Sequence, residues 1–191
     1  ECVVNEVLKC IRSRRSCRNF SPEPLKNEEL DMIVEAGLWA PSGNNKQPWF
    51  FTVIRNRLTV KKINENAKVN ALKYLTDPKR VAVAKNVGFD LFYGAPCLII
   101  VSADMRSGTA VADCSAAIQN MLLAAESLRI GSLWNGIIRR FWFETPGVEE
   151  FRNEYDIPEE YTPLYAAAFG YRPEKIQDGP ERKTGAVKYF N

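Results

Sequence analysis

Apolar residues follow two patterns along this chain: helical spacing in long segments, and short continuous runs typical of buried strands. Helical spacing predicts helices near residues 3–12, 27–39, 58–75, 78–92, 109–128 and 146–155. The runs predict strands at residues 49–54, 97–103 and 164–171, a short extended piece at 133–138, and a strand-capable end at 186–190. Helices outnumber strands without regular alternation, which predicts an α+β fold. Without repeats or an internal boundary, residues 1–191 are expected to form one domain.

Several helix boundaries follow from residues that favour helix ends. Asn27 and Asn56 can cap the second and third helices, and Pro146 suits the first position of the last one. Gly131 is expected to end the helix that begins near Thr109. That helix is rich in Ala and Ser, which allow close packing, so we expect it at the centre of the fold.

The composition is that of an ordinary globular protein. The 191 residues are 46% apolar and 26% charged, and the net charge of +3 gives no bulk argument for nucleic-acid binding. No apolar run approaches the roughly 20 residues that span a bilayer, so we expect no membrane partner. Because histidine is absent, Ser-His and Cys-His hydrolases are excluded and no metal site is expected. Five cysteines without a CxxC pair, and no secretory signal before the first helix, favour a reduced, cytoplasmic protein.

A polar loop between the second helix and the first strand is the first candidate for chemistry. Two prolines exclude it from a helix interior, and its amide and hydroxyl groups can both donate and accept hydrogen bonds. Such a loop can bind the edge of a flat heterocycle, although the same residues are typical of an ordinary helix-to-strand turn. Its candidate binding residues are Pro41, Ser42, Gly43, Asn45 and Gln47.

A cluster of arginines before the second helix is the second candidate for chemistry. Arg14, Arg15 and Arg18 lie close together with Ser16, and guanidinium forks match phosphate geometry. A solvated helix end or a nucleic-acid patch would give the same composition. A ligand with a phosphate at one end and a heterocycle at the other, such as flavin mononucleotide (FMN), could contact both the cluster and the loop.

Two further segments have both a structural and a functional interpretation. Gly136 allows a ligand to approach the backbone closely, and a backbone N–H of this turn could point at a flavin N5. An isolated Trp134 is more typical of a core. The pair Arg182-Lys183 is either a charged surface turn or an additional phosphate contact.

Together these segments resemble the FMN-dependent nitroreductase family. Residues 14–20 resemble its opening Arg-Arg-Ser-x-Arg-x-Phe, and residues 40–49 resemble its Ala-Pro-Ser…Asn-x-Gln-Pro-Trp segment. Residues 93–96, 113–132 and 169–171 are similar to its middle, its central helix and its end. The matching segments occur in the same order between roughly residues 10 and 185.

The resemblance implies a mixed, mainly antiparallel sheet flanked by helices, and an intertwined homodimer that exchanges a C-terminal strand. FMN would lie at the subunit interface, with the polar loop commonly reaching the partner's flavin. Arginines would hold the phosphate and the pyrimidine edge, and the 134–137 turn would lie near N5. The cofactor-binding residues implied are Arg14, Arg15, Ser16, Arg18, Pro41, Ser42, Gly43, Asn45, Gln47, Trp134, Asn135, Gly136, Ile137, Arg182 and Lys183.

The activity implied is ping-pong reduction of nitroaromatic, quinone or related small acceptors, with NAD(P)H as reductant. FMN would carry the chemistry, so no catalytic side chain is assigned. The helix at 78–92 could form part of a lid over the site. The alternatives are a module that stores or senses flavin without turnover, and a flavin-dependent dehalogenase or flavin-fragmenting enzyme on the same fold.

Overall fold

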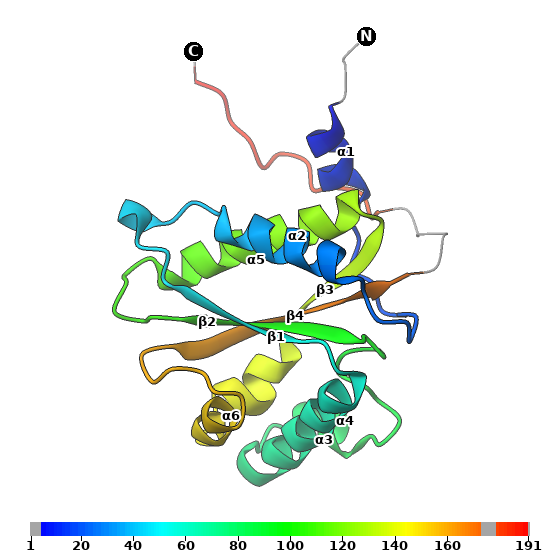
Figure 1. Cartoon of the computed structure of the whole chain (residues 1–191), viewed down its shortest axis with the longest axis vertical. Coiled ribbons are helices and arrows are strands. Elements are labelled where there is room, and N and C mark those ends of the chain that lie inside the picture. Colours follow the sequence, from blue (N-terminus) through cyan, green and yellow to red (C-terminus); the bar gives the residue numbers. More distant parts are fainter. Residues whose placement is uncertain (1–4, 173–178, 191) are drawn as a thin grey trace.

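A computed structural model describes residues 5–172 and 179–190. Helices lie on both faces of one sheet, as Figure 1 shows. The strands are β1 (Trp49–Ile54), β2 (Cys97–Ala103), β3 (Ile130–Asn135) and β4 (Thr162–Tyr171). The α-helices are α1 (Glu6–Ser13), α2 (Asn27–Leu38), α3 (Arg57–Tyr74), α4 (Pro78–Lys85), α5 (Ala110–Ser127) and α6 (Val148–Glu154). A 3-10 turn, η1 (Gly43–Asn45), and a π-helical turn, η2 (Arg139–Phe143), complete the elements.

The sheet has the order β1-β2-β4-β3, and every neighbouring pair of strands is antiparallel. The predicted α+β class is therefore confirmed. The parallel component of the predicted mixed sheet is reduced to one isolated bridge, between Ser16 and Ser132. The order leaves β3 at an edge of the sheet, opposite β1. Residues 186–190 adopt no strand within this chain, so the predicted strand exchange stays a prediction.

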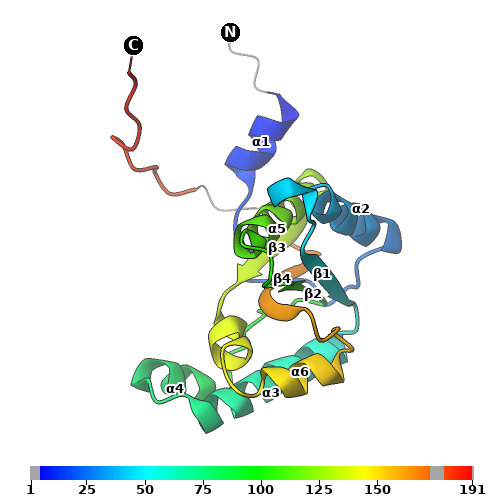
Figure 2. The same cartoon turned by 90° about the vertical axis from the view of Figure 1, so that its left-hand side faces the viewer.

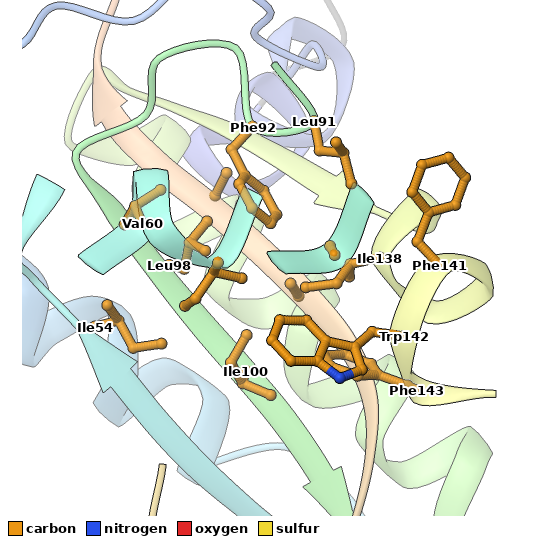
Figure 3. Close-up of a cluster of buried hydrophobic side chains, with 14 of the residues drawn as sticks. Ile54, Val60, Leu91, Phe92, Leu98, Ile100, Ile138, Phe141, Trp142 and Phe143 are labelled. Carbon is orange, nitrogen blue, oxygen red and sulfur yellow. The ribbon is translucent and has the colours of Figure 1, made fainter. Parts of the chain in front are cut away.

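Strand β2 is buried on both faces because helices cover both sides of the sheet. Leu98 and Ile100 point to the side of α3 and η2, whereas Ile99 and Val101 point to α2 and α5. This alternation explains why a continuous apolar run forms a central strand. Figure 3 shows the first of these two cores, in which side chains from β1, β2, α3 and η2 converge.

Helix ends agree with the sequence where a side chain supplies the cap. Asn56 Oδ1 accepts hydrogen bonds from the Leu58 and Thr59 amides at 2.8 and 3.3 Å, as predicted. The predicted cap at Asn27 is wrong by one residue. Lys26 is the N-cap, and the Asn27 side chain instead accepts a hydrogen bond from Arg55.

Three other boundaries differ from the prediction. Gly131 belongs to β3, because the chain leaves α5 earlier, through Arg129 with a φ of 59°. Pro146 precedes the N-cap of α6, which is Gly147. Helix α4 ends at Lys85, since the Asn86 side chain accepts from the Gly88 amide and forms a local turn that competes with the helix.

Helix α1 and residues 179–190 lie on the α5 side of the sheet, outside the two main layers (Figures 1 and 2). Helix α1 leaves Val7, Leu8 and Ile11 largely exposed in the single chain. None of the helices in the described ranges is both long enough and apolar enough to span a bilayer.

Candidate functional site

The arginine cluster lies at the start of the edge strand β3. The chain leaves α1 after Ser13 and runs beside β3, where Ser16 bridges Ser132. The Cys17 amide donates to the Ser132 carbonyl at 2.9 Å and fixes this register. Ser16 and Arg18 are exposed, and Arg15 is half-buried. The backbone pairing with β3 therefore positions the side chains from Arg14 to Arg18.

The C-terminal segment returns to the same arginines from the other end of the chain. Gly179 packs so closely on the Arg15 guanidinium that a Cβ there would lie 1.9 Å from Nη2. Burial lowers the pKa of Arg14, and the neighbouring charges of Arg15 and Arg182 lower it further. The Arg182 charge thus lies near enough to act on Arg14, while both Arg182 and Lys183 are exposed, and their contact with a phosphate stays a prediction.

A buried ion pair, which no sequence pattern predicted, supports this cationic cluster. Glu126, near the end of α5, accepts from Ser13 Oγ at 2.7 Å and from Arg172 Nη1 at 2.6 Å. The Glu126 and Arg172 side chains are only 6% and 11% exposed. The carboxylate thus joins α1, α5 and the end of β4, and its charge acts on Arg14.

The polar loop is anchored at the opposite end of α5. The Gly43 amide donates to Asp113 Oδ1 at 3.2 Å, and Thr109 Oγ1 donates to Asp113 Oδ2 at 2.8 Å. A Cβ at Gly43 would lie 2.4 Å from Thr109 Oγ1, so this position requires a glycine. Neither Thr109 nor Asp113 was expected to support the loop.

Within the loop, side chains and backbone hold an unusual conformation. Gln47 donates its amide to Ser42 Oγ at 3.0 Å and its side-chain Nε2 to Asn45 Oδ1 at 3.1 Å. Asn44, Asn45 and Gln47 all have positive φ, at 53°, 53° and 47°. Pro41, Asn45 and Gln47 remain exposed. The loop is thus held in one shape with its amides at the surface.

One chain does not bring the loop and the arginines together. The loop contacts α5 at Asp113 and the arginine segment contacts it at Glu126. These residues are separated along the helix by about 20 Å at 1.5 Å per residue. The two predicted halves of the site therefore lie at opposite ends of α5 within one chain.

The turn after β3 is organised by Asn135, which is buried. Its Nδ2 donates to the Leu91 carbonyl at 2.5 Å, and its Oδ1 accepts from the Ile137 and Ile138 amides at 3.0 and 3.1 Å. The Ile137 amide is therefore engaged within the chain, and the contact of another backbone N–H of this turn with a flavin N5 stays a prediction. Gly136 is exposed, and a Cβ there would meet nothing within 4 Å.

Trp134 has a structural role as well as a place beside this turn. Its ring is partly buried and packs edge-on against Tyr165, with centroids 5.1 Å apart. Tyr165 in turn accepts a hydrogen bond from Arg139 Nη1 at 2.7 Å. The Trp134 side chain is thus packed against β4 at the end of β3.

A pocket of about 340 Å³ opens beside the Gly136 turn. Val83, Ile137 and Phe141 form apolar walls, and the remaining lining residues are Lys79, Arg80, Gly136 and Arg140. Helix α4 belongs to the segment 78–92 that was predicted to form part of a lid, but its cations were not among the predicted site residues. A larger groove of about 980 Å³ follows α3 and lies away from the edge strand β3.

Residues 5–172 and 179–190 contain no group of three or more His, Cys, Asp or Glu arranged to hold a metal ion. Burial raises the pKa of Cys97 and of Cys114 to about 12, so both are neutral thiols at pH 7. Burial also raises the pKa of Cys17.

Known proteins match the chain over most of its length. A family model described as the nitroreductase family matches residues 11–171. A protein named as an NADH dehydrogenase/NAD(P)H nitroreductase from Methanothermobacter thermautotrophicus is 33% identical over 173 residues, covering 88% of this chain and 78% of that protein.

Solved structures agree with this match. A nitroreductase with bound FMN from Bacteroides fragilis is 31% identical, with a TM-score of 0.91, and the match covers 98% of this chain and 100% of the other. Another with bound FMN, from Desulfitobacterium hafniense, is 29% identical with a TM-score of 0.86 over 99% and 100% of the two chains. Since sequence and structure agree over nearly the whole chain, this protein belongs to the nitroreductase family.

Proposed function

We propose that the protein is an FMN-dependent oxidoreductase that takes electrons from NAD(P)H and reduces small acceptors such as nitroaromatics or quinones. The observation that carries the proposal is the arrangement along the edge strand β3. The arginine segment bridges β3 at Ser132, and the open turn at Gly136 follows at its end. Four residues of strand separate these points by about 13 Å. A ligand with a phosphate and a distant ring system suits this spacing.

The residues at the start of β3 have the chemistry that a phosphate requires. Arg14, Arg15 and Arg182 gather there from both ends of the chain. Arg15 Nη1 donates to the Arg12 and Arg14 carbonyls at 2.7 and 2.6 Å, which holds this guanidinium at the start of β3. Like charges held together repel one another, and a bound dianion would relieve this repulsion. These cations fit the phosphate end of FMN.

We infer that each flavin site is completed by a second copy of the chain. The polar loop and the arginines are anchored at opposite ends of α5. A two-fold axis near the middle of α5 would place the loop of one subunit beside the arginines of its partner. One face of helix α5 carries a stripe that the described residues bury only in part, formed by Val111, Ser115, Gln119 and Leu123. Such a stripe suits close contact with a second copy.

In this proposal, bound FMN supplies the hydride chemistry and the protein supplies binding and orientation. Arg18 stabilises negative charge at the pyrimidine edge, and exposed loop amides such as Asn45 and Gln47 bind the ring edge in the partner's site. The turn at Gly136 leaves room for a ring at the end of β3. NAD(P)H and the acceptor use the same open face in succession. The four described cysteines are free thiols, which suits the proposed cytoplasmic location.

An absorption spectrum of the purified protein, recorded with and without NADPH under argon, tests the proposal. We expect a yellow protein that NADPH bleaches and that turns over menadione. A yellow protein that stays oxidised would indicate a flavin-binding module instead. A colourless protein that takes up no FMN would refute the assignment, and salt-sensitive RNA retention would then be tested at the arginine cluster.

The role of Arg18 has a separate test. We expect Arg18→Ala to weaken FMN binding roughly tenfold, through loss of one charge-assisted contact, and to slow reduction. Arg57→Ala is the matched control, because it removes an equally exposed cation from α3. Unchanged FMN affinity and kinetics in Arg18→Ala would remove Arg18 from the site.

A further inference from the structure

We propose that the pocket beside the Gly136 turn selects electron acceptors that are single-ring aromatic carboxylates, with Lys79 and Arg80 binding the anionic group. The inference rests on the proposed flavin function, because the pocket shares Gly136 and Ile137 with the turn assigned to the flavin. It goes further in naming the charge and the size of the acceptor.

The size and walls of the pocket define the apolar part of the acceptor. Its volume of about 340 Å³ is near the lower end of the range for ligand pockets, about 300–1,000 Å³, which favours one ring over a fused system. Val83, Ile137 and Phe141 supply apolar contact from α4, the turn and η2. Phe141 is 2% exposed, so its wall of the pocket is firmly held by the core.

The charges around the pocket define the polar part. Lys79 and Arg80 are exposed on α4, and within residues 5–172 and 179–190 neither forms an ion pair with a carboxylate. Arg140 differs, because it pairs with Glu144, which also pairs with Arg139 at 2.7 Å. The unpaired positive charge of the pocket therefore comes from Lys79 and Arg80.

The position of these two cations on α4 strengthens their field. Both follow Pro78 in the first helical turn, where the backbone dipole already contributes positive charge. Helices α1, α2, α5 and α6 instead carry an acidic residue in that turn. The Asp77 cap accepts a hydrogen bond from the Arg80 amide, which offsets only part of this charge. An anion at the pocket mouth would offset the rest.

Paired acceptors of equal shape test the charge preference. We would compare 4-nitrobenzoate with 4-nitrobenzamide as acceptors for the FMN-loaded protein, at low ionic strength. Two cations, each at an assumed distance of roughly 6 Å from the carboxylate in the dielectric constant of water, favour the anion by about tenfold in kcat/KM. At about 1 M salt, where screening acts within roughly 3 Å, the ratio should fall toward one.

A variant and a charge-matched control assign the preference to these side chains. We expect Lys79→Gln/Arg80→Gln to lose the preference for 4-nitrobenzoate while the rate with 4-nitrobenzamide stays the same. The control Arg57→Gln/Lys61→Gln removes two exposed cations from α3 and should keep the preference. Charge reversal, Lys79→Glu/Arg80→Glu, should favour a 4-nitrobenzyl trimethylammonium acceptor instead.

Binding of benzoate gives a readout that does not depend on turnover. Calorimetry should show benzoate binding about tenfold more tightly than benzamide, and the Lys79→Gln/Arg80→Gln variant should lose this difference. Equal reduction of both nitro compounds would overturn the inference and leave the proposed function intact. Selective benzoate binding without any reduction would overturn the function and support the pocket. A variant that changes only the affinity for NADPH would also overturn the inference, since the cations would then serve the reductant.

Discussion

Replacing Glu126 with alanine removes a buried carboxylate that joins three segments around the arginine cluster. The Glu126 side chain is 6% exposed and is bound by Arg172, which is 11% exposed, and by Ser13. In the Glu126→Ala variant the Arg172 guanidinium stays buried without its partner. Ser13 also loses its acceptor, so the segment that carries Arg14 is no longer tied to α5.

The magnitude follows from this burial. Removing one partner of a buried pair destabilises a protein by about 3–5 kcal/mol, whereas an exposed pair contributes about 0–1 kcal/mol. A typical domain has about 5–15 kcal/mol of stability, so this loss is a large fraction of it. For a chain of this length, each kcal/mol lowers Tm by about 2–4 °C, which gives a total of roughly 6–20 °C.

Urea unfolding and calorimetry at one fixed protein concentration would measure the loss, and flavin fluorescence would measure FMN release. Glu65→Ala is the control, because Glu65 lies 3.9 Å from Lys61 in an exposed pair. The double variant Glu126→Met/Arg172→Met removes both charges with little change in volume, and we expect it to be nearly as stable as the wild type. A loss below about 1 kcal/mol in Glu126→Ala, or a double variant as unstable as the single one, would refute the reasoning.

Three other perturbations follow from the packing and the titration of buried groups. Phe151→Ala should cost about 3–5 kcal/mol in urea unfolding, because this fully buried ring packs at 4.8 Å from Trp142. Burial raises the pKa of the Cys97 thiol in the folded chain from an ordinary 9.0 to about 12. Its contribution to stability is therefore present below pH 9.0 and is lost between pH 9.0 and about 12, by about 1.4 kcal/mol per pH unit. Gly43→Ala should destabilise the loop by about 1–3 kcal/mol and weaken FMN binding.

Each of these expectations has its own control. Val87→Ala, at a position that is 95% exposed, should leave the unfolding midpoint unchanged. Cys97→Ala should lose less stability than the wild type as the pH rises above 9.0, and parallel pH profiles would contradict the assignment. Thr109→Ala should rescue Gly43→Ala, because it removes the atom 2.4 Å from the new Cβ. An unrescued double variant would mean that Thr109 is not the obstacle.

The elements that the sequence predicted correctly are those with a local signal. Strands β1 and β2 were predicted to the residue, because each is a continuous apolar run bounded by polar or turn residues. The Asn56 cap was predictable because side chain and helix are adjacent in sequence. The end of α4 was not, since Val87 continues the apolar pattern yet is 95% exposed beyond the Asn86 turn.

The residues of the candidate site were likewise predictable only where the signal is local in the sequence. The residue types for phosphate binding were visible in the arginine cluster and in Arg182, but their approach depends on the path of the C-terminal segment across Arg15. The supporting roles of Glu126 and Asp113 could not be predicted, because each depends on a tertiary contact. Their partners lie 113 and 70 positions away in the sequence. Lys79 could not be predicted as a site residue, because the pocket beside it is formed by η2 and the Gly136 turn, which are distant in the sequence.

Helix α5 acts as a spacer that both proposed flavin sites share. Deleting four residues from its middle would leave its buried stripe nearly in phase but bring its two ends roughly 6 Å closer together. In the proposed dimer, each site combines the loop end of one copy with the arginine end of the other, so this deletion would misalign both sites at once. Changes in length are therefore expected to be tolerated at the surface loops and excluded from the interior of α5.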